Sequence, residues 1–226
     1  MRTPRPDSAG KPSCFPSSPT RLLIALGAAA LFALLAWGVE RHRFVSIDVG
    51  LMQWVHAHAH ALPDRIMIAF TYLGSAAVLA PLEILFLCWL LSRRKIAIAA
   101  FLAAAVGGAA LVNAMLKGLF ERQRPLLWEP LVHEGSYSFP SGHAMHTMAL
   151  LLALALVLGS SRGRGHGWRF FVALALVLTV GFSRVYLGVH YPSDVLGGWL
   201  AALAWVALCS APLQARRMRL LPRRNS

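Results

Sequence analysis

Three short polar clusters interrupt a chain in which 57% of the residues are hydrophobic. The clusters are KGLFERQRP at 117–125, PSGH at 140–143 and SRVYLGVHYPSD at 183–194. Each contributes groups that suit a phosphate. The first and third supply lysine and arginine cations, the second a serine hydroxyl beside a glycine, and the second and third histidines that could act as an acid, a base or a nucleophile. Together they predict a phosphate site with its own acid–base groups.

The first cluster ends in two cations, Lys117 and Arg124, seven residues apart. A compact ammonium and a planar guanidinium are complementary ligands of a phosphate. The simpler alternative is that both side chains anchor the chain at a membrane interface, because long cationic side chains reach toward lipid headgroups.

The second cluster has the composition of a turn into a helix. Pro140 and Gly142 favour the turn, and Ser141 could be the N-cap. A helix start also exposes free N–H groups, and Gly142 lets the backbone approach an anion closely. Ser141 adds a hydroxyl donor, and His143 in the first turn could protonate a leaving oxygen. His146 follows at i+3, but a metal-binding pair is disfavoured because no acidic third ligand lies nearby in the sequence.

The third cluster combines Arg184, His190 and Asp194. Asp194 lies four residues after His190, about one helical turn, so its carboxylate can reach one imidazole nitrogen. That contact would fix the tautomer and leave the other nitrogen free as a base or nucleophile. The alternative is a structural hydrogen bond that ties a loop to a helix. An unpaired Arg184 at the end of an apolar segment would be costly, which favours a functional site.

Six apolar segments of about 20 residues, the length that crosses a bilayer as a helix, position these clusters. They cover 21–40, 66–92, 96–117, 144–161, 168–188 and 194–212. The expected fold class is therefore all-α: a polytopic membrane protein with a six-transmembrane-helix bundle at 21–212. The first segment could be a cleaved signal peptide, but it is long and no clear small-residue cleavage site follows it.

The distribution of charge predicts the orientation. Most of the 22 lysines and arginines lie near the N-terminus, at 93–95, at 162–169 and at 216–224. Because cytoplasmic loops are enriched in such residues, both termini should be cytoplasmic, with the tails 1–20 (disordered) and 213–226 on that side. The connections 41–65, 118–143 and 189–193 then face outward. We expect a multi-pass protein of the cytoplasmic (inner) membrane with its polar clusters on the periplasmic or extracellular face.

Composition excludes two other classes of function. The formal charge of +13 would fit nucleic acid, but the cations flank apolar segments, as membrane proteins require, so no nucleic-acid partner is expected. Cys14, Cys88 and Cys209 lie far apart, two of them in apolar runs, so no disulfide framework or thiolate metal site is expected.

In this order the clusters resemble the three-part signature of the type-2 phosphatidic acid phosphatase superfamily. The matching patterns are K-x6-R-P at 117–125, P-S-G-H at 140–143 and S-R-x5-H-x3-D at 183–194, with every signature position filled. The resemblance covers the six-helix region 21–212. Each motif alone is moderately specific, whereas all three in order are very specific.

The resemblance implies a role for each matched residue. His190 would attack phosphorus and form a phosphohistidine, and Asp194 would orient it. His143 would protonate the leaving oxygen and then activate the water that hydrolyses the intermediate. Three cations and a helix start would hold the phosphate oxygens: Lys117, Arg124, Arg184, Ser141 and the backbone N–H of Gly142. The resemblance implies no metal and no other cofactor.

The predicted function is therefore that of an integral membrane lipid phosphatase. Its substrate would be a lipid phosphomonoester or diphosphate, such as phosphatidic acid, phosphatidylglycerol phosphate or undecaprenyl diphosphate, and its other partners membrane lipids. One alternative is a lipid phosphotransferase that uses the same phosphohistidine. The other is a transporter or binder of anionic lipids, which would explain the cations but not the two histidines beside an aspartate.

Several polar residues have no place in this scheme. His56, His58 and His60 fall in an outward connection that could form an interfacial helix, where His56 and His60 would share a face. Glu83 falls inside the second apolar segment, where we expect only a polar neighbour.

Overall fold

The computed structural model describes residues 18–132, 134–158 and 166–219, and within these ranges it contains helices and no strands. The all-α prediction is confirmed. In chain order the elements are α1 Ser18–Glu40, α2 Val45–His56, α3 Ala61–Leu73, α4 Ala76–Ser92, α5 Ile96–Leu102, the π-helical turn η1 Ala103–Gly107, α6 Gly108–Phe120, α7 Gly142–Leu158, α8 His166–Tyr186 and α9 Pro192–Arg219.

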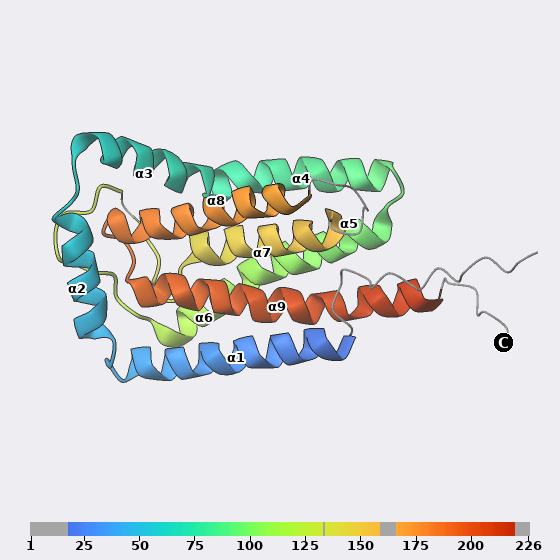
Figure 1. The fold of residues 1–226 in the computed structure, drawn as a ribbon, viewed down its shortest axis with the longest axis horizontal. Coiled ribbons are helices and arrows are strands. Elements are labelled where there is room, and N and C mark those ends of the chain that lie inside the picture. Colours follow the sequence, from blue (N-terminus) through green and yellow to red (C-terminus); the bar gives the residue numbers. More distant parts are fainter. Residues whose placement is uncertain (1–17, 133, 159–165, 220–226) are drawn as a thin grey trace, which may run out of the picture.

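The long helices run alongside one another as a bundle, and α2 lies across one end of it (Figure 1). Four helical segments are long and apolar enough to cross a membrane: Pro19–Glu40, Leu62–Ser92, Ile96–Phe120 and Pro192–Ser210. Two shorter apolar helices, Gly142–Leu158 and Phe170–Tyr186, occupy the remaining predicted positions. The protein is thus a helical membrane protein, and crossing by all six segments stays a prediction.

The predicted boundaries shift at both ends of the chain. Helix α1 begins at Ser18 and α9 continues to Arg219, so helix extends into both predicted tails. The remainder of those tails, 1–17 and 220–226, lies outside the described residues, as do residues 159–161 of the fourth predicted segment.

The segment predicted at 66–92 is interrupted between α3 and α4. Gly74 lies at this break, where an added Cβ would be 2.4 Å from Cγ1 of Val180 on α8. The absence of a side chain therefore lets the α3–α4 junction pack directly against α8.

The third apolar segment contains the π-helical turn η1. Such a turn loosens the regular ladder of backbone hydrogen bonds. Trp205 of α9 donates through Nε1 to the carbonyl oxygen of Ala104 at 3.0 Å. This bond ties α9 to the third segment.

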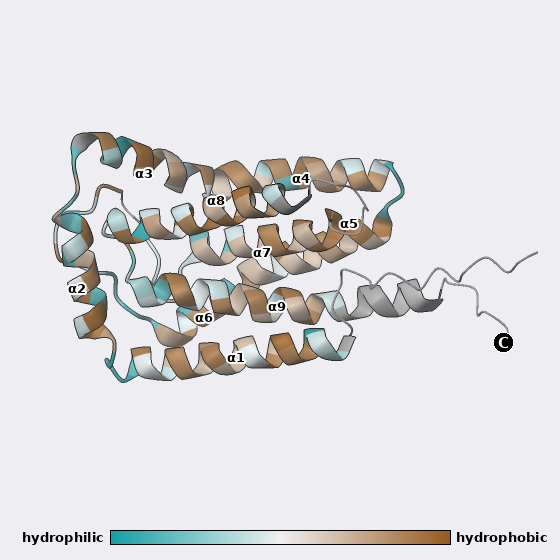
Figure 2. Ribbon diagram, in the orientation of Figure 1, coloured by the Kyte–Doolittle hydropathy of each residue, from teal (hydrophilic) through white to brown (hydrophobic). Residues whose placement is uncertain are grey.

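Helix α9 packs against α1 and α7. Small residues make the α7 contact close: a Cβ added to Gly198 would lie 2.7 Å from the carbonyl oxygen of Ser141. Figure 2 shows hydrophilic residues gathered toward the ends of the bundle, with apolar residues along the helices between them. Many large apolar side chains on these helices, among them Leu111 and Met115, are exposed, as a lipid-facing surface requires.

The connection 41–65, predicted to face outward, contains α2 and the start of α3, and α2 ends at His56. His58 and His60 lie beyond it, so the expectation that His56 and His60 share a helical face is wrong. His56 stacks on Trp128 with ring centroids 4.0 Å apart, and His58 contacts the carbonyl oxygen of Trp54 at 2.8 Å. His60 precedes α3 instead of continuing α2.

Candidate active site

The three polar clusters meet at the end of the bundle covered by α2, where α6 ends and α7 and α9 begin (Figure 1). Arg124 Nη1 lies 3.1 Å from His190 Nε2, which joins the first cluster to the third. The backbone N–H of Ser141 donates to the carbonyl oxygen of Asp194 at 2.9 Å, which joins the second to the third. Residues up to 77 positions apart, Lys117 to Asp194, thus surround one site.

His190 is held rigidly between α8 and α9, with 1% of its surface exposed. The turn before it depends on Gly188, whose φ of +78° favours glycine. Nδ1 of His190 lies 3.4 Å from Asp194 Oδ2, while Nε2 faces Arg124. Because a guanidinium can only donate, Nε2 must be the accepting, unprotonated nitrogen, and Nδ1 carries the proton toward Asp194.

Burial lowers the pKa of His190 to about 4, although the Asp194 carboxylate acts in the opposite direction. The imidazole is therefore neutral at neutral pH. A neutral ring with its Nε2 lone pair directed at a cation is chemically suited to attack an electrophile bound by that cation.

Asp194 is fully buried and accepts hydrogen bonds at both carboxylate oxygens. Oδ2 accepts from the Ser138 hydroxyl and, at 2.9 Å, from the backbone N–H of Tyr191. Oδ1 accepts from Arg122 Nη1 at 2.6 Å. These donors hold the carboxylate in its ionised form facing His190.

A second buried carboxylate, Asp48 of α2, supports this arrangement from outside the three clusters. Asp48 accepts from Arg122 at 2.9 Å, and from the backbone N–H and hydroxyl of Ser193 at 3.0 and 2.5 Å. Arg122 therefore bridges two aspartates and lies over the ring of Tyr191 at 4.1 Å. Sequence reasoning missed both residues, although Arg122 lies inside the first cluster.

Glu134, in the connection before α7, lies among the predicted phosphate ligands. It forms an ion pair with Arg184, approaches Arg124 at 3.8 Å, and lies 4.0 Å from His143 Nδ1. Burial would raise the pKa of Glu134, but Arg184, His143 and Arg124 outweigh burial and lower it. Glu134 is therefore an ionised carboxylate that organises the cations of the site, and the sequence analysis did not single it out.

Two buried polar atoms in the described part of the chain have no hydrogen-bond partner and belong to the predicted site. They are the hydroxyl oxygen of Ser141 and Nε of Arg184. The Ser141 hydroxyl therefore does not cap α7, contrary to the simpler interpretation of PSGH. At Gly142, an added Cβ would lie 3.2 Å from Oδ1 of Asn113, so a side chain at this helix start would require Asn113 to shift by a few tenths of an ångström. Unsatisfied donors beside bare backbone fit an oxyanion.

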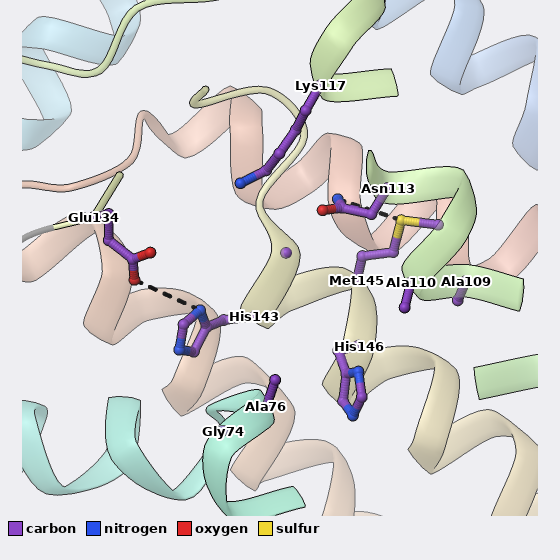
Figure 3. A pocket seen from close by; sticks show the side chains of 11 residues that line it. Gly74, Ala76, Ala109, Ala110, Asn113, Lys117, Glu134, His143, Met145 and His146 are labelled. Atoms are coloured by element: carbon purple, nitrogen blue, oxygen red, sulfur yellow. Dashed lines mark hydrogen bonds and ion pairs between the residues drawn. The ribbon is translucent and has the colours of Figure 1, made fainter. Parts of the chain in front are cut away.

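A pocket of about 230 Å³ opens beside His143. In Figure 3, Lys117, Glu134 and His143 direct their polar ends toward one another at one side of it. Lys117 donates to the Ser136 hydroxyl at 2.7 Å. Small residues of the α3–α4 junction and of α6 form much of the remaining wall, and His146 lies at the far side.

His146 has a partner that the sequence did not reveal. Its Nε2 lies 2.8 Å from Oε1 of Glu83 on α4. His146 is therefore the polar neighbour that the sequence analysis expected for Glu83. Within the described ranges no three His, Cys, Asp or Glu side chains converge as a metal site would require.

Comparisons with known proteins found a matching family model and similar sequences. The family model described as the PAP2 superfamily matches residues 96–218. Phosphatidylglycerophosphatase B of Bacillus subtilis (strain 168) is 31% identical over 175 residues, which cover 76% of this chain and 86% of the relative. Undecaprenyl-diphosphatase BcrC of the same organism is 31% identical over 152 residues, 65% of this chain and 73% of the relative.

Solved structures resemble the fold as well as the sequence. A crystal structure of a transmembrane PAP2-type phosphatidylglycerolphosphate phosphatase from Bacillus subtilis superposes with a TM-score of 0.76 at 27% identity, covering 89% of this chain and 99% of that one. The structure of LpxE from Aquifex aeolicus superposes with a TM-score of 0.58 at 28% identity, covering 72% and 94%.

Proposed function

The chain belongs to the PAP2 superfamily, and from this premise we propose that it hydrolyses lipid phosphates through a phosphohistidine on His190. It is a membrane enzyme that acts on phosphoric esters, as its relatives' names state of them. One observation carries the proposed mechanism: His190 is buried and neutral, with Nδ1 toward Asp194 and the Nε2 lone pair toward Arg124.

In the first step Nε2 of His190 attacks phosphorus while the bond between phosphorus and the lipid oxygen breaks. His143 gives its proton to that leaving oxygen. The positive charge that develops on the His190 ring is stabilised by Asp194, which Ser138 and Arg122 hold in place.

In the second step His143, now neutral, takes a proton from water as the water oxygen attacks phosphorus. The bond between Nε2 and phosphorus breaks, inorganic phosphate leaves, and both histidines return to their starting states. The same residue therefore serves as acid and then as base.

Charge on the phosphoryl oxygens needs stabilisation in both steps, because phosphoryl transfer depends mainly on positioning and electrostatics. We assign this role to the cations Lys117, Arg124 and Arg184, with the Ser141 hydroxyl and the N–H of Gly142. The unpartnered Arg184 Nε and Ser141 Oγ support the assignment. These groups can neutralise a phosphate without a metal, so we expect metal-independent activity.

We further propose that residues 21–212 form the catalytic domain in the cytoplasmic membrane, with both termini cytoplasmic and the site on the outer face. The charge distribution of the connections supports this orientation. A site at the ends of apolar helices suits a phosphate attached to a lipid, such as phosphatidic acid, phosphatidylglycerol phosphate or undecaprenyl diphosphate.

The test is phosphate release by the purified full-length protein in detergent micelles, with these three lipids as substrates and EDTA present. We expect free phosphate from at least one lipid and none with His190→Ala. His58→Ala, which removes a histidine outside the site, is the matched control and should retain wild-type activity. Inhibition by EDTA, phosphate transfer only to another alcohol, or full activity of His190→Ala would each contradict the proposal.

A further inference from the structure

Glu83 is an acidic side chain in the middle of an otherwise apolar, lipid-facing helix. Its neighbours Leu82, Ile84 and Leu85 are exposed on the outside of the bundle. A carboxylate at such a depth is costly, and in membrane proteins it commonly marks a functional site with a specific partner. Here the partner is His146 at 2.8 Å, and among the described residues it is the only hydrogen-bond partner of the Glu83 side chain.

Of the pair, His146 lines the pocket that holds His143, and Glu83 contacts His146 from α4 without itself being one of the lining residues. His146 lines this pocket together with His143, and the side chains of His146 and Glu83 are 14% and 19% accessible. Figure 3 shows His143 directed toward Glu134 and His146 directed away from it. A molecule whose phosphate lies at the Lys117 side of the pocket would therefore extend toward His146.

We propose that Glu83 and His146 form a subsite for the leaving alcohol, which recognises a hydroxyl group close to the ester oxygen. This inference rests on the proposed function, because it assumes that His143 protonates that oxygen. The subsite would make the enzyme selective for phosphomonoesters of hydroxyl-bearing alcohols, such as a glycerol with a free hydroxyl.

The dimensions of α7 fit this class of substrate. His143 and His146 are three residues apart, so they are separated by about 4.5 Å along the helix axis. A hydroxyl one or two carbons from the ester oxygen is about that far from the phosphate. Glu83 uses Oε1 and His146 uses Nε2 in their mutual contact, which leaves one carboxylate oxygen to accept and one ring nitrogen to bond with such a hydroxyl.

The charge of the pair argues against a diphosphate. In a lipid diphosphate the group next to the leaving oxygen is a second, anionic phosphate, which would lie close to the Glu83 carboxylate. Like charges at such distances in a partly desolvated site repel strongly. A neutral hydroxyl has no such penalty, so the pair should discriminate between the two classes of substrate.

The experiment compares kcat/KM for three substrates. Phosphatidylglycerol phosphate has a free hydroxyl beside the ester carbon, phosphatidic acid has none, and undecaprenyl diphosphate has a second phosphate. The first variant, Glu83→Leu with His146→Leu, removes both partners, because removing one would leave an unpaired polar group in the membrane. The second, Glu83→Gln, keeps the volume and a hydrogen bond but removes the charge. Thr179→Val, which removes a hydroxyl from α8 outside the pocket, is the control.

We expect the double variant to lose about 10–100-fold in kcat/KM for phosphatidylglycerol phosphate, and to stay within about twofold of wild type for phosphatidic acid. Glu83→Gln should raise activity on undecaprenyl diphosphate relative to phosphatidylglycerol phosphate, a gain that a purely structural role would not produce. Thr179→Val should leave all ratios unchanged.

Equal losses on all substrates would overturn the inference and make the pair a structural link between α4 and α7. Unchanged ratios in both pocket variants would also overturn it. A wild-type protein that hydrolyses none of the three lipids would instead refute the proposed function itself.

Discussion

Replacing Gly198 by alanine tests whether the close approach of α9 to α7 aligns the site. The added Cβ would lie 2.7 Å from the carbonyl oxygen of Ser141 and 3.0 Å from the backbone nitrogen of Met145. Ordinary contact begins at 3.4 Å, so the two helices must separate by about 0.7 Å. Because α9 carries Asp194 and α7 begins at Gly142, the separation moves the two halves of the site apart.

Overpacking of this kind costs about 1–3 kcal/mol, and a misplacement near 1 Å can cost on the order of 10²-fold in rate. We therefore expect Gly198→Ala to unfold at a lower temperature in detergent and to lose about 10–100-fold in kcat for phosphate release. Gly27→Ala on α1 is the control, because its Cβ would have nothing within 4 Å. A Gly198→Ala variant with wild-type kcat would refute the reasoning that this contact aligns the site.

Three further predictions concern the site and its support. Asp48→Asn should lower kcat about 10–100-fold in the phosphate-release assay, because it weakens charged hydrogen bonds, worth about 1.5–3 kcal/mol, that hold the start of α9. A variant with wild-type kcat would contradict the claim that Asp48 holds the start of α9 in place. The folded-state pKa of His190 is lowered to about 4, so below pH about 6.5 the folded protein binds fewer protons than the unfolded chain. The contribution of His190 to the free energy of unfolding should therefore be fully present above that pH and should decrease toward pH 4 by at most about 3 kcal/mol. His190→Phe should flatten that slope, and an unchanged slope would contradict the assignment. With p-nitrophenyl phosphate, whose leaving group needs no acid, His143→Ala should release one equivalent of nitrophenol in a burst and then turn over slowly; a linear time course at the wild-type rate would exclude His143 as the base.

The sequence was sufficient to predict the helical membrane fold and the meeting of the three clusters. Long apolar segments determine helices directly, and the clusters lie at their ends, so antiparallel packing brings them to one face. The break at Gly74 was not predicted, since a glycine within an apolar segment is compatible with a continuous helix.

The supporting residues were missed because their contacts connect distant positions. Asp48 reaches Arg122 across 74 positions, and Glu83 reaches His146 across 63. One signal was available: the chain has only 9 acidic residues, so a carboxylate in an apolar helix, or in a connection predicted to lie on the same side as the phosphate-binding cations, needs a partner. That reasoning would have placed Asp48 and Glu134 among the candidates for pairing with the cations of the site, together with Asp64, Glu121 and Glu129.

The central claim is that His190 forms a covalent bond to phosphorus during turnover. The direct measurement is rapid alkaline quenching of the purified protein mixed with 32P-labelled lipid substrate, followed by peptide mapping, because phosphohistidine survives alkali and is lost in acid. We expect alkali-stable label on the peptide that contains His190, and none with His190→Ala. Absence of label from the wild-type protein while it releases phosphate, or label that persists in His190→Ala, would contradict the account.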